Sequence, residues 1–380
     1  MKLITIGIDA ANIRRGGGLT HLIELLESSR PLDLGIDRVV VWGGRHTLNA
    51  LDDRSWLDKR NPSALNAGLL QRTLWQCFCL SQAARDAGCD VLFVPGGSYV
   101  GNFHPVVSMS QNLLPFEFGE LKRYNWSFMT IKLLLLRLIQ SFSYRNVDGL
   151  IFLTEYAHLV VLKVTGSLHA KIATIPHGLN PRFTQPPKPQ RAIGDYDASN
   201  PYRVLYVSII DQYKHQWHVV EAIAALRERG FPVVLHLIGP AYAPALKRLN
   251  RAIARHEGAK SWIYYHGSIP FDELHFYYAR ADLGLFASSC ENMPNILLET
   301  MASGLPVACS NRGPMPEVLA AAGIYFDPES PEDIACAVQK LIESPDLRNA
   351  LSQEGYCHAQ QYSWKCCADK TFKFLIETLE

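Results

Sequence analysis

Residues 283–310 read LGLFASSCENMPNILLETMASGLPVACS and contain a complete strand–helix–strand pattern. The apolar run LGLFAS (283–288) ends in polar residues, an apolar helical segment follows Pro294, and PVACS (306–310) reads as the next strand. Both strand runs are nearly continuous in apolar residues rather than alternating. Such runs are typical of strands buried on both faces, in a parallel sheet that helices cover. This stretch therefore predicts an α/β fold.

The same pattern recurs along the whole chain. Further strands are predicted from the runs KLITIGID, RVVVWGG, DVLFVPGG, PVVSMSQ, GLIFLT, KIATIPHG, RVLYVSI, VVLHLIG, IYYHGSI and IYF. Helical periodicity lies between them, as in Leu19–Glu27 and Gln71–Ala87, and Ser363–Leu379 reads as a final amphipathic helix. A chain of 380 residues exceeds one ordinary hydrophobic core, so we expect two α/β domains.

The composition changes sharply in TQPPKPQRAIGDYDASNP (184–201), which holds four prolines and few large apolar residues. This segment reads as a linker. We therefore predict an N-terminal domain at 1–183, a C-terminal domain at 202–362 and a last helix at 363–380. The cleft between two such domains is the expected ligand site, and ligands of open parallel sheets lie beyond the carboxyl ends of the strands.

The composition excludes several classes of protein. A formal net charge of +1 gives no general reason to expect a nucleic-acid partner. Nine scattered cysteines, without zinc-ligand spacing, are expected to be reduced thiols. The longest apolar run, around Leu133–Ile139, is interrupted by charge and is too short to span a membrane. No leader segment is recognisable before the first strand, so we expect a cytoplasmic protein.

Two glutamates flank the start of the helix that follows LGLFAS. Glu291 precedes it and Glu299 lies inside it, up to about 12 Å away at 1.5 Å per residue. That separation suits two hydroxyl-bearing parts of one extended ligand better than one shared metal. Pro294 suits the first helical turn, whose free amides can hold a diphosphate. Taken alone, a capping carboxylate and a solvated helix residue would be the alternative.

The pattern Glu-x7-Glu followed by Ala-x-Gly-x-Pro (302–306) resembles the family 4 retaining glycosyltransferases of GT-B fold. The resemblance implies two Rossmann-like domains that face each other across a cleft, with the last helix crossing back to the first domain. It also implies that Glu291 contacts the hydroxyls of the donor sugar and Glu299 those of the ribose. The diphosphate and sugar would be held by the backbone around Asn292, Met293, Pro294, Asn295 and Ile296.

The same family has a strand, then Gly-Arg, then a lysine that grips the diphosphate. Lys214 matches that lysine, whereas Ser208 and Ile209 stand where Gly-Arg is usual. The resemblance thus implies that Lys214 stabilises the departing nucleotide, with Ser208 beside the donor. One hypothesis is that Arg14 or Arg15 supplies the missing cation.

The first strand is followed by Gly16, Gly17 and Gly18, which would let the backbone approach the donor phosphates. The dinucleotide fingerprint G-x-G-x-x-G fails because its last position is His21, which argues against a dehydrogenase. A loop without function is the alternative for these glycines.

Three further segments match the family in part. Asn112 stands where the family often has a histidine; it can hydrogen-bond a substrate but is no general base. His177 replaces an asparagine at the entry to the linker and is expected to be structural. Glu317 matches a glutamate that would order the loop beyond the donor helix. Asp195 and Asp197 form an Asp-x-Asp sequence inside the linker, where the metal motif of the other glycosyltransferase fold does not belong, so neither a metal nor another cofactor is expected.

Leu121–Arg145 is rich in basic, aromatic and leucine residues. Its composition is that of a helix lying in the plane of a membrane surface, and an ordinary core helix with a solvated basic face is the alternative. Five cations contribute to the pattern, Lys122, Arg123, Lys132, Arg137 and Arg145. A membrane-docking lobe would suit a lipid-linked acceptor at the inner face of the cytoplasmic membrane.

The resemblance thus implies a metal-independent hexosyltransferase that retains anomeric configuration, in polysaccharide or lipopolysaccharide biosynthesis. Its substrates would be a nucleotide-sugar and a saccharide or lipid-linked saccharide. The alternatives are a nucleotide-sugar epimerase or phosphorylase on the same fold, and a catalytically impaired binding protein.

Overall fold

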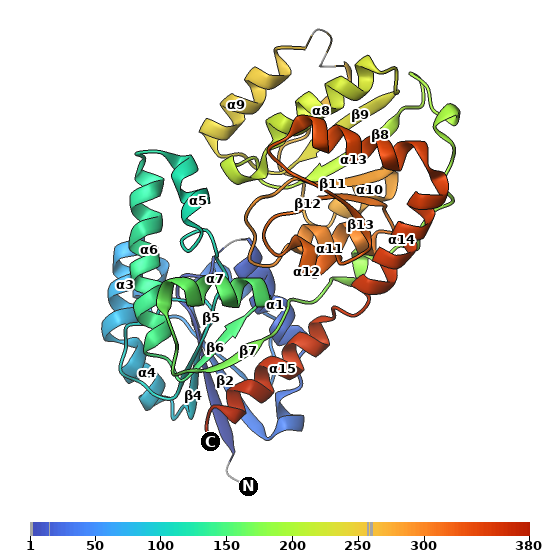
Figure 1. Cartoon of the computed structure of the whole chain (residues 1–380). Coiled ribbons are helices and arrows are strands. Elements are labelled where there is room, and N and C mark those ends of the chain that lie inside the picture. Colours follow the sequence, from blue (N-terminus) through green and yellow to red (C-terminus); the bar gives the residue numbers. More distant parts are fainter. Residues whose placement is uncertain (1–2, 15, 257, 259–260) are drawn as a thin grey trace. The chain divides into compact units, whose positions relative to one another are not determined.

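The computed structural model describes residues 3–14, 16–256, 258 and 261–380 (Figure 1). The chain divides into two units. Unit 1 comprises residues 1–121, 125–178 and 362–380, and unit 2 comprises residues 122–124 and 179–361. The C-terminal residues therefore belong with the N-terminal part of the chain. Each unit is built around one parallel β-sheet.

The sheet of unit 1 has seven strands in the order β3-β2-β1-β4-β5-β6-β7, and every neighbouring pair is parallel. The strands are β1 (Ile4–Ala10), β2 (Ile36–Gly43), β3 (Leu57–Arg60), β4 (Val91–Val94), β5 (Val106–Met109), β6 (Gly149–Phe152) and β7 (Lys171–Thr174). The central strands β4, β5 and β6 are buried at every position, as their continuous apolar runs predict. Strand β3 was not predicted, because its sequence LDKR is charged and only half-buried at the sheet edge.

The helices of unit 1 are α1 (Gly17–Glu27), α2 (Arg45–Asn49), α3 (Leu69–Phe78), α4 (Leu80–Asp86), α5 (Phe118–Leu121), α6 (Phe128–Arg145), α7 (Glu155–Thr165) and α15 (Trp364–Glu377). The single helix predicted at Gln71–Ala87 is wrong, because the chain breaks at Cys79 into α3 and α4.

Helix α15 contributes to the core of unit 1. The ring of Trp364 lies 5.4 Å from that of His177, which in turn lies 4.7 Å from the buried ring of His21 on α1. Three segments distant in sequence are thereby packed together. His21 and His177 therefore have a packing role.

The sheet of unit 2 has six parallel strands in the order β10-β9-β8-β11-β12-β13. The strands are β8 (Tyr202–Val207), β9 (Val233–Ile238), β10 (Ile263–Tyr265), β11 (Leu283–Phe286), β12 (Val307–Ser310) and β13 (Gly323–Phe326). The helices are α8 (Gln216–Glu228), α9 (Ala243–Ile253), α10 (Leu274–Arg280), α11 (Asn295–Ala302), α12 (Met315–Leu319), α13 (Pro331–Glu343) and α14 (Pro345–Ala359). The strand order reverses between β8 and β11, and such a switch point opens a crevice at the carboxyl ends of the strands.

The proline-rich segment 184–201 is packed along unit 2. The buried guanidinium of Arg348 on α14 donates hydrogen bonds to the backbone carbonyl of Arg191 and, at 3.0 Å, to Oε1 of Gln190. The ring of Tyr196 meets that of Tyr202 edge-on, with centroids 5.1 Å apart. These contacts explain why the segment counts with unit 2.

Candidate functional site

The carboxyl edge of the second sheet brings Lys214 and Glu291 together. Lys214 ends the 3₁₀ turn Gln212–Lys214 that follows β8, and Glu291 lies in the loop that follows the neighbouring strand β11. Lys214 Nζ donates to Glu291 Oε1, and the two side chains are only 6% and 15% exposed. Burial removes solvent screening, so the interaction is stronger than in a surface pair. Lys214 is therefore not an exposed surface lysine.

Hydrogen bonds between the two loops hold this pair in place. Tyr206 Oη donates to the carbonyl of Lys214 at 2.7 Å, and the backbone N–H of Ser289 donates to the carbonyl of Tyr213 at 2.8 Å. His215 adopts a left-handed conformation (φ 53°) and places its Nε2 2.9 Å from Ser289 Oγ. Burial lowers the pKa of His215 to about 3, so its ring is neutral at pH 7.

Ser208 lies just beneath this edge, at the end of β8. Its backbone N–H donates to the carbonyl of Ile238 at 2.8 Å, and its Oγ accepts from Gln216 Nε2 at 2.9 Å. Gly239 has a φ of 142°, and a Cβ there would overlap the carbonyl of Ser208. The close approach of β8 and β9 thus requires glycine at this position. Ser208 is buried, whereas Ile209 is partly exposed.

Helix α11 begins at Asn295, with Pro294 as its N-cap residue. The prediction that Pro294 lies within the first helical turn is therefore wrong by one residue. No side-chain hydrogen bond caps this helix among the described residues. Asn292 and Met293 are buried beside the cap, and Ile296 lies in the first turn. Backbone amides of a first turn, together with the helix dipole, favour an anion.

Glu299 is buried inside α11 and is not the solvated residue of the alternative interpretation. Its Oε2 accepts a hydrogen bond of 3.2 Å from Tyr278 Oη on α10. Burial raises the pKa of Glu299 to about 8, although the Tyr278 hydrogen bond and Arg182 partly oppose the shift. The carboxyl group is therefore mostly protonated at pH 7.

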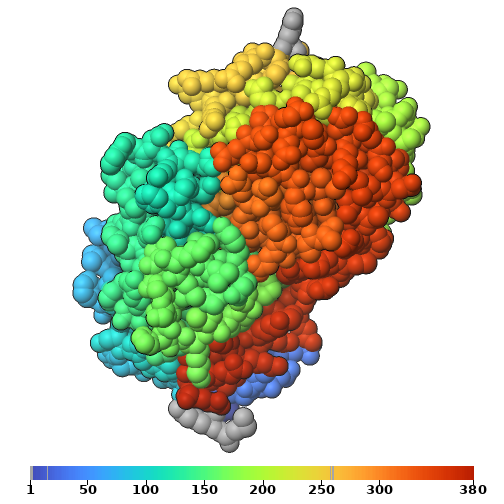
Figure 2. Space-filling model, in the orientation of Figure 1, coloured from blue at the N-terminus to red at the C-terminus, as the bar shows by residue number. Residues whose placement is uncertain are grey.

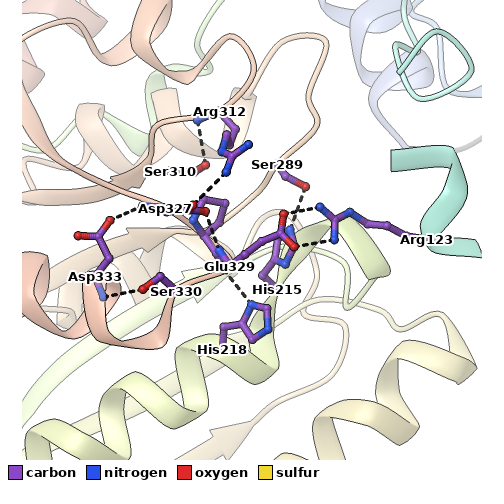
Figure 3. Close-up of polar contacts among 11 residues, drawn as sticks. Arg123, His215, His218, Ser289, Ser310, Arg312, Asp327, Glu329, Ser330 and Asp333 are labelled. Atoms are coloured by element: carbon purple, nitrogen blue, oxygen red, sulfur yellow. Dashed lines mark hydrogen bonds and ion pairs between the residues drawn. The ribbon is translucent and has the colours of Figure 1, made fainter. Parts of the chain in front are cut away.

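A polar network that the sequence did not predict lies near His215 (Figure 3). Arg123, which counts with unit 2, donates to both carboxylate oxygens of Glu329 at 2.6 and 3.0 Å. The Arg123 guanidinium lowers the pKa of Glu329 to about 2. Arg312 donates to Asp327 Oδ2 at 2.9 Å in the same loop region. Arg123, expected among the membrane-facing cations, is thus engaged by a carboxylate.

The remaining predicted site residues belong to unit 1. Gly17 and Gly18 form the start of α1, where a Cβ on Gly18 would lie 3.1 Å from Gln111 Oε1. Asn112 is exposed, and its Oδ1 accepts from the backbone of Leu114 at 3.1 Å. Arg14 Nη2 donates to the carbonyl of Leu65 at 3.4 Å, and Arg15 lies outside the described residues. Gly17, Gly18, Asn112 and Arg14 therefore belong to a different unit from Lys214, Glu291 and Glu299.

Unit 1 also holds a buried carboxyl group at the end of β1. Asp9 Oδ1 accepts from the backbone of Ala11 at 3.0 Å, and Oδ2 accepts from Gln76 Nε2. Burial raises the pKa of Asp9 to about 6, against the opposing effect of these two hydrogen bonds. A single acid within the run ITIGIDA was the only signal for it in the sequence.

The Asp-x-Asp sequence forms a turn. Asp195 ends the 3₁₀ turn Ile193–Asp195, and Asp197 Oδ1 accepts backbone hydrogen bonds of 2.7 and 2.9 Å from Ser199 and Asn200. Within the described ranges, His, Cys, Asp and Glu side chains form no group of three or more that could hold a metal ion. Asp197 thus shapes the turn before β8.

Residues 195–358 match the family described as "Glycosyl transferases group 1". The chain is 32% identical over 112 residues to the O-antigen chain mannosyltransferase B of Escherichia coli, covering 30% of this chain and 29% of that protein. It is 26% identical over 264 residues to a GDP-mannose-dependent alpha-(1-6)-phosphatidylinositol monomannoside mannosyltransferase of Mycobacterium tuberculosis, covering 66% of each. The chain spans less than a third of the length of the first curated relatives it matches.

A solved structure resembles the chain over nearly its whole length. The Anabaena protein HepE, in complex with UDP and glucose, superimposes with a TM-score of 0.73 at 16% identity, covering 98% of this chain and all of that one. This likeness and the two parallel-sheet units confirm the predicted GT-B fold class.

Proposed function

We propose that the chain is a group 1 glycosyltransferase, whose family model matches residues 195–358, and that it transfers a sugar from a nucleotide-sugar donor to a saccharide acceptor. The observation that carries the proposal is the buried Lys214–Glu291 pair at the switch point of the second sheet. A buried ion pair is an expensive feature for stability alone. Two such groups beside a helix N-terminus suit a ligand that offers both a diphosphate and sugar hydroxyls.

The roles follow from the chemistry of each group. The Lys214 ammonium would leave Glu291 and bind the diphosphate, together with the first amides of α11. Glu291 would then accept hydrogen bonds from hydroxyls of the donor sugar. Glu299, held by Tyr278, would bind the ribose hydroxyls. The donor would thus replace the contact that Lys214 and Glu291 make with one another.

Retention of configuration is part of the proposal. The Glu291 carboxylate is engaged by Lys214, which does not favour it as a covalent nucleophile. We infer a front-face reaction in which the leaving phosphate takes the proton of the acceptor hydroxyl as the new bond forms. Lys214 and the helix dipole would stabilise the charge on the leaving diphosphate, so that the reaction proceeds without a metal ion.

The names of two relatives support a hexose donor and an acceptor built on a lipid or polysaccharide. Both are called mannosyltransferases, and their acceptors are an O-antigen chain and a phosphatidylinositol monomannoside. The HepE structure holds UDP and glucose. We therefore propose hexosyl transfer to a saccharide that is carried at a membrane surface.

Helix α6 supports contact with a membrane because it exposes an apolar face, although Leu133 and Tyr144 are buried. Its buried positions include polar residues, Gln140, Ser141 and Ser143. Its exposed positions carry an apolar stripe, Phe128, Ile131, Leu134, Leu135, Leu138 and Phe142, which follows the fully exposed Trp126. Figure 2 shows this segment, in teal, on the visible surface. The core-helix alternative does not explain an apolar face that is turned to solvent.

The proposed occupant of this stripe is an anionic bilayer surface. Lys132 is exposed on the same helix as the stripe, and Arg137 of that helix is half-buried. Cations beside an apolar helical face are suited to anionic headgroups. No helix among the described residues is both long and apolar enough to cross a membrane.

Vesicle co-sedimentation tests this contact. Ile131→Ser/Leu138→Ser should reduce binding to phosphatidylglycerol vesicles at least about tenfold, because each change removes apolar area from the stripe. Leu32→Ser/Leu159→Ser, at exposed leucines elsewhere in unit 1, is the matched control and should bind like the wild type. Equal binding of both variants, or wild-type binding that does not depend on anionic lipid, would contradict the proposal.

Thermal stabilisation by UDP, GDP, ADP, dTDP and NAD tests the donor site. One nucleoside diphosphate at about 100 times its Kd should stabilise the wild type by about 2.7 kcal/mol. Glu299→Ala and Lys214→Ala should abolish that shift, and the exposed-surface variant Arg251→Ala should keep it. Stabilisation by NAD alone, or by none of the five, would overturn the proposal.

Product analysis separates the alternatives. A transferase converts the donor only when an acceptor is present, an epimerase converts the donor alone, and a phosphorylase requires phosphate. Donor binding without turnover would favour an impaired binding protein. Full activity in Arg14→Ala and Arg15→Ala would rule out both arginines as replacements for the missing Gly-Arg cation.

A further inference from the structure

Unit 2 also holds a cavity on the face of its sheet, away from the edge where Lys214 and Glu291 lie. The sheet-face cavity has a volume of about 580 Å³. Its walls include Arg203, Leu205, His236, His266, Tyr277 and Arg280. These residues come from β8, from β9, from the end of β10 and from α10. Cavities of this size hold small organic ligands.

The charge in the sheet-face cavity is positive. The side chain of Arg280 makes no hydrogen bond or ion pair with any described residue. Arg203 lies 4.0 Å from Asp282, whose carboxylate already accepts from the Arg203 backbone at 2.9 Å and from Tyr196 Oη at 3.0 Å. A smaller hollow of about 250 Å³ shares Arg203 and Arg280, and it adds Lys188 to the same positive region. Asp282 is the one acid that lines either hollow among the described residues.

Two histidines supply a neutral donor beside these cations. His236 Nδ1 and His266 Nε2 lie 2.9 Å apart, so one must donate and the other accept. Whichever ring donates, one of the two outer ring nitrogens is left with a proton to offer a ligand. Burial, the neighbouring His266 and Arg203 lower the pKa of His236 to about 4, which keeps this pair uncharged at pH 7.

Tyr277 belongs to the cavity wall, and Tyr264 packs on the wall residue His236. Tyr264 stacks on His236 with centroids 5.0 Å apart, and Tyr277 meets His266 edge-on at 5.2 Å. The planar guanidinium group of arginine matches the oxygens of a phosphate group. Tyr277 and Leu205 offer an apolar surface to the carbon skeleton of a ligand. A phosphate ester combines these two properties.

We propose that the sheet-face cavity binds a small organic phosphate monoester at a site separate from the donor site. Helix α10 connects the two sites, since Tyr277 faces the cavity whereas its neighbour Tyr278 donates to Glu299. A ligand that shifts α10 therefore changes the affinity of the donor site, and the donor changes the affinity of the cavity by the same factor.

Calorimetric titration of the whole chain with glucose 6-phosphate tests the proposal. Without a nucleoside diphosphate, the wild type and Lys214→Ala should bind the probe with the same Kd within about twofold. A saturating nucleoside diphosphate should change the Kd of the wild type by the coupling factor and leave the Kd of Lys214→Ala unchanged. Arg203→Ala/Arg280→Ala should weaken binding more than about tenfold, because it removes the cations that face the phosphate. Glucose should not bind, which shows that the phosphate is required.

A second variant keeps the test independent of folding. Arg280 is exposed, so Arg280→Glu should fold and still weaken the probe more than about tenfold. Arg251→Glu makes the same charge change at an exposed position of α9 outside the cavity and should bind like the wild type. Loss of binding in Lys214→Ala would place the probe in the donor site. The proposal would be overturned by that outcome, by equal binding of the probe to Arg280→Glu and Arg251→Glu, or by no binding to the wild type at about 10 mM probe.

Discussion

The two parallel sheets have closely related architectures, and the carboxyl edges of their strands differ in chemistry. The edge of the second sheet carries a buried ion pair, Lys214–Glu291, and the start of α11. The end of β1 in the first sheet carries one buried acid, Asp9, whose partners are an amide side chain and a backbone N–H. The fold therefore supplies two similar edges, and among the described residues Asp9 at the end of β1 has no cationic partner like that of Glu291.

The largest expected effect comes from breaking the pair. Lys214→Met should reduce transfer about 10²–10³-fold, because it removes the cation proposed to stabilise the leaving group. It should also destabilise unit 2 by about 3–5 kcal/mol, since Glu291 is left buried without its partner. Donor-dependent transfer and urea unfolding measure the two effects.

A double variant separates these effects. Lys214→Met/Glu291→Gln should regain most of the stability, because no unpaired charge remains, and should stay inactive. Recovery of activity in the double variant would show that the pair is structural only.

The second-largest expected effect is a pH dependence of the stability of unit 2. The pKa of Glu299 is about 8 in the folded chain and 4.5 in the unfolded one, so the folded state holds one more proton between these values. Stability should therefore fall as pH rises through this window, by about 1.4 kcal/mol per pH unit. Glu299→Gln should remove this contribution and be the more stable protein at pH 8. Unfolding curves from pH 5 to 8 that run parallel in both proteins would contradict a buried, protonated Glu299.

The smallest expected effect is a pH dependence of the stability of unit 1. The pKa of Asp9 rises from 3.8 to about 6, so its contribution to stability is lost over a narrower range, between about pH 4 and 6. Asp9→Asn should flatten the stability profile there and leave the profile between pH 6 and 8 unchanged. Transfer should stay within about twofold of wild type, because the proposed donor contacts lie in unit 2. A large loss of activity would show that the edge of the first sheet takes part in the reaction.

Much of the fold could be predicted because buried parallel strands have continuous apolar runs. The edge strand β3 was missed since LDKR lacks such a run, and the break at Cys79 lies in a segment whose periodicity looks uninterrupted. The orientation of α6 was left open, because periodicity shows that a helix has two faces and does not show which face is covered.

The site could be predicted in part. Glu291 and Glu299 were found from one spaced motif that resembles a family, and Lys214 from a second segment that resembles the same family. Their environment depends on residues distant in sequence, which no local pattern reveals. Tyr278, which holds Glu299, lies on another helix, and the Arg123–Glu329 contact joins residues 206 positions apart.

Helix α15 has a consequence for how the protein is made. Unit 1 lacks residues 362–380 until the ribosome has translated all of residues 179–361. At about 5–20 residues per second, this delay lasts roughly 10–40 s. Throughout it, the surface that receives Trp364 beside His21 and His177 stays uncovered on the nascent chain. Synthesis therefore completes unit 1 last. A stop codon placed before α15 would destabilise unit 1, although the rest of that unit is encoded in the first half of the gene.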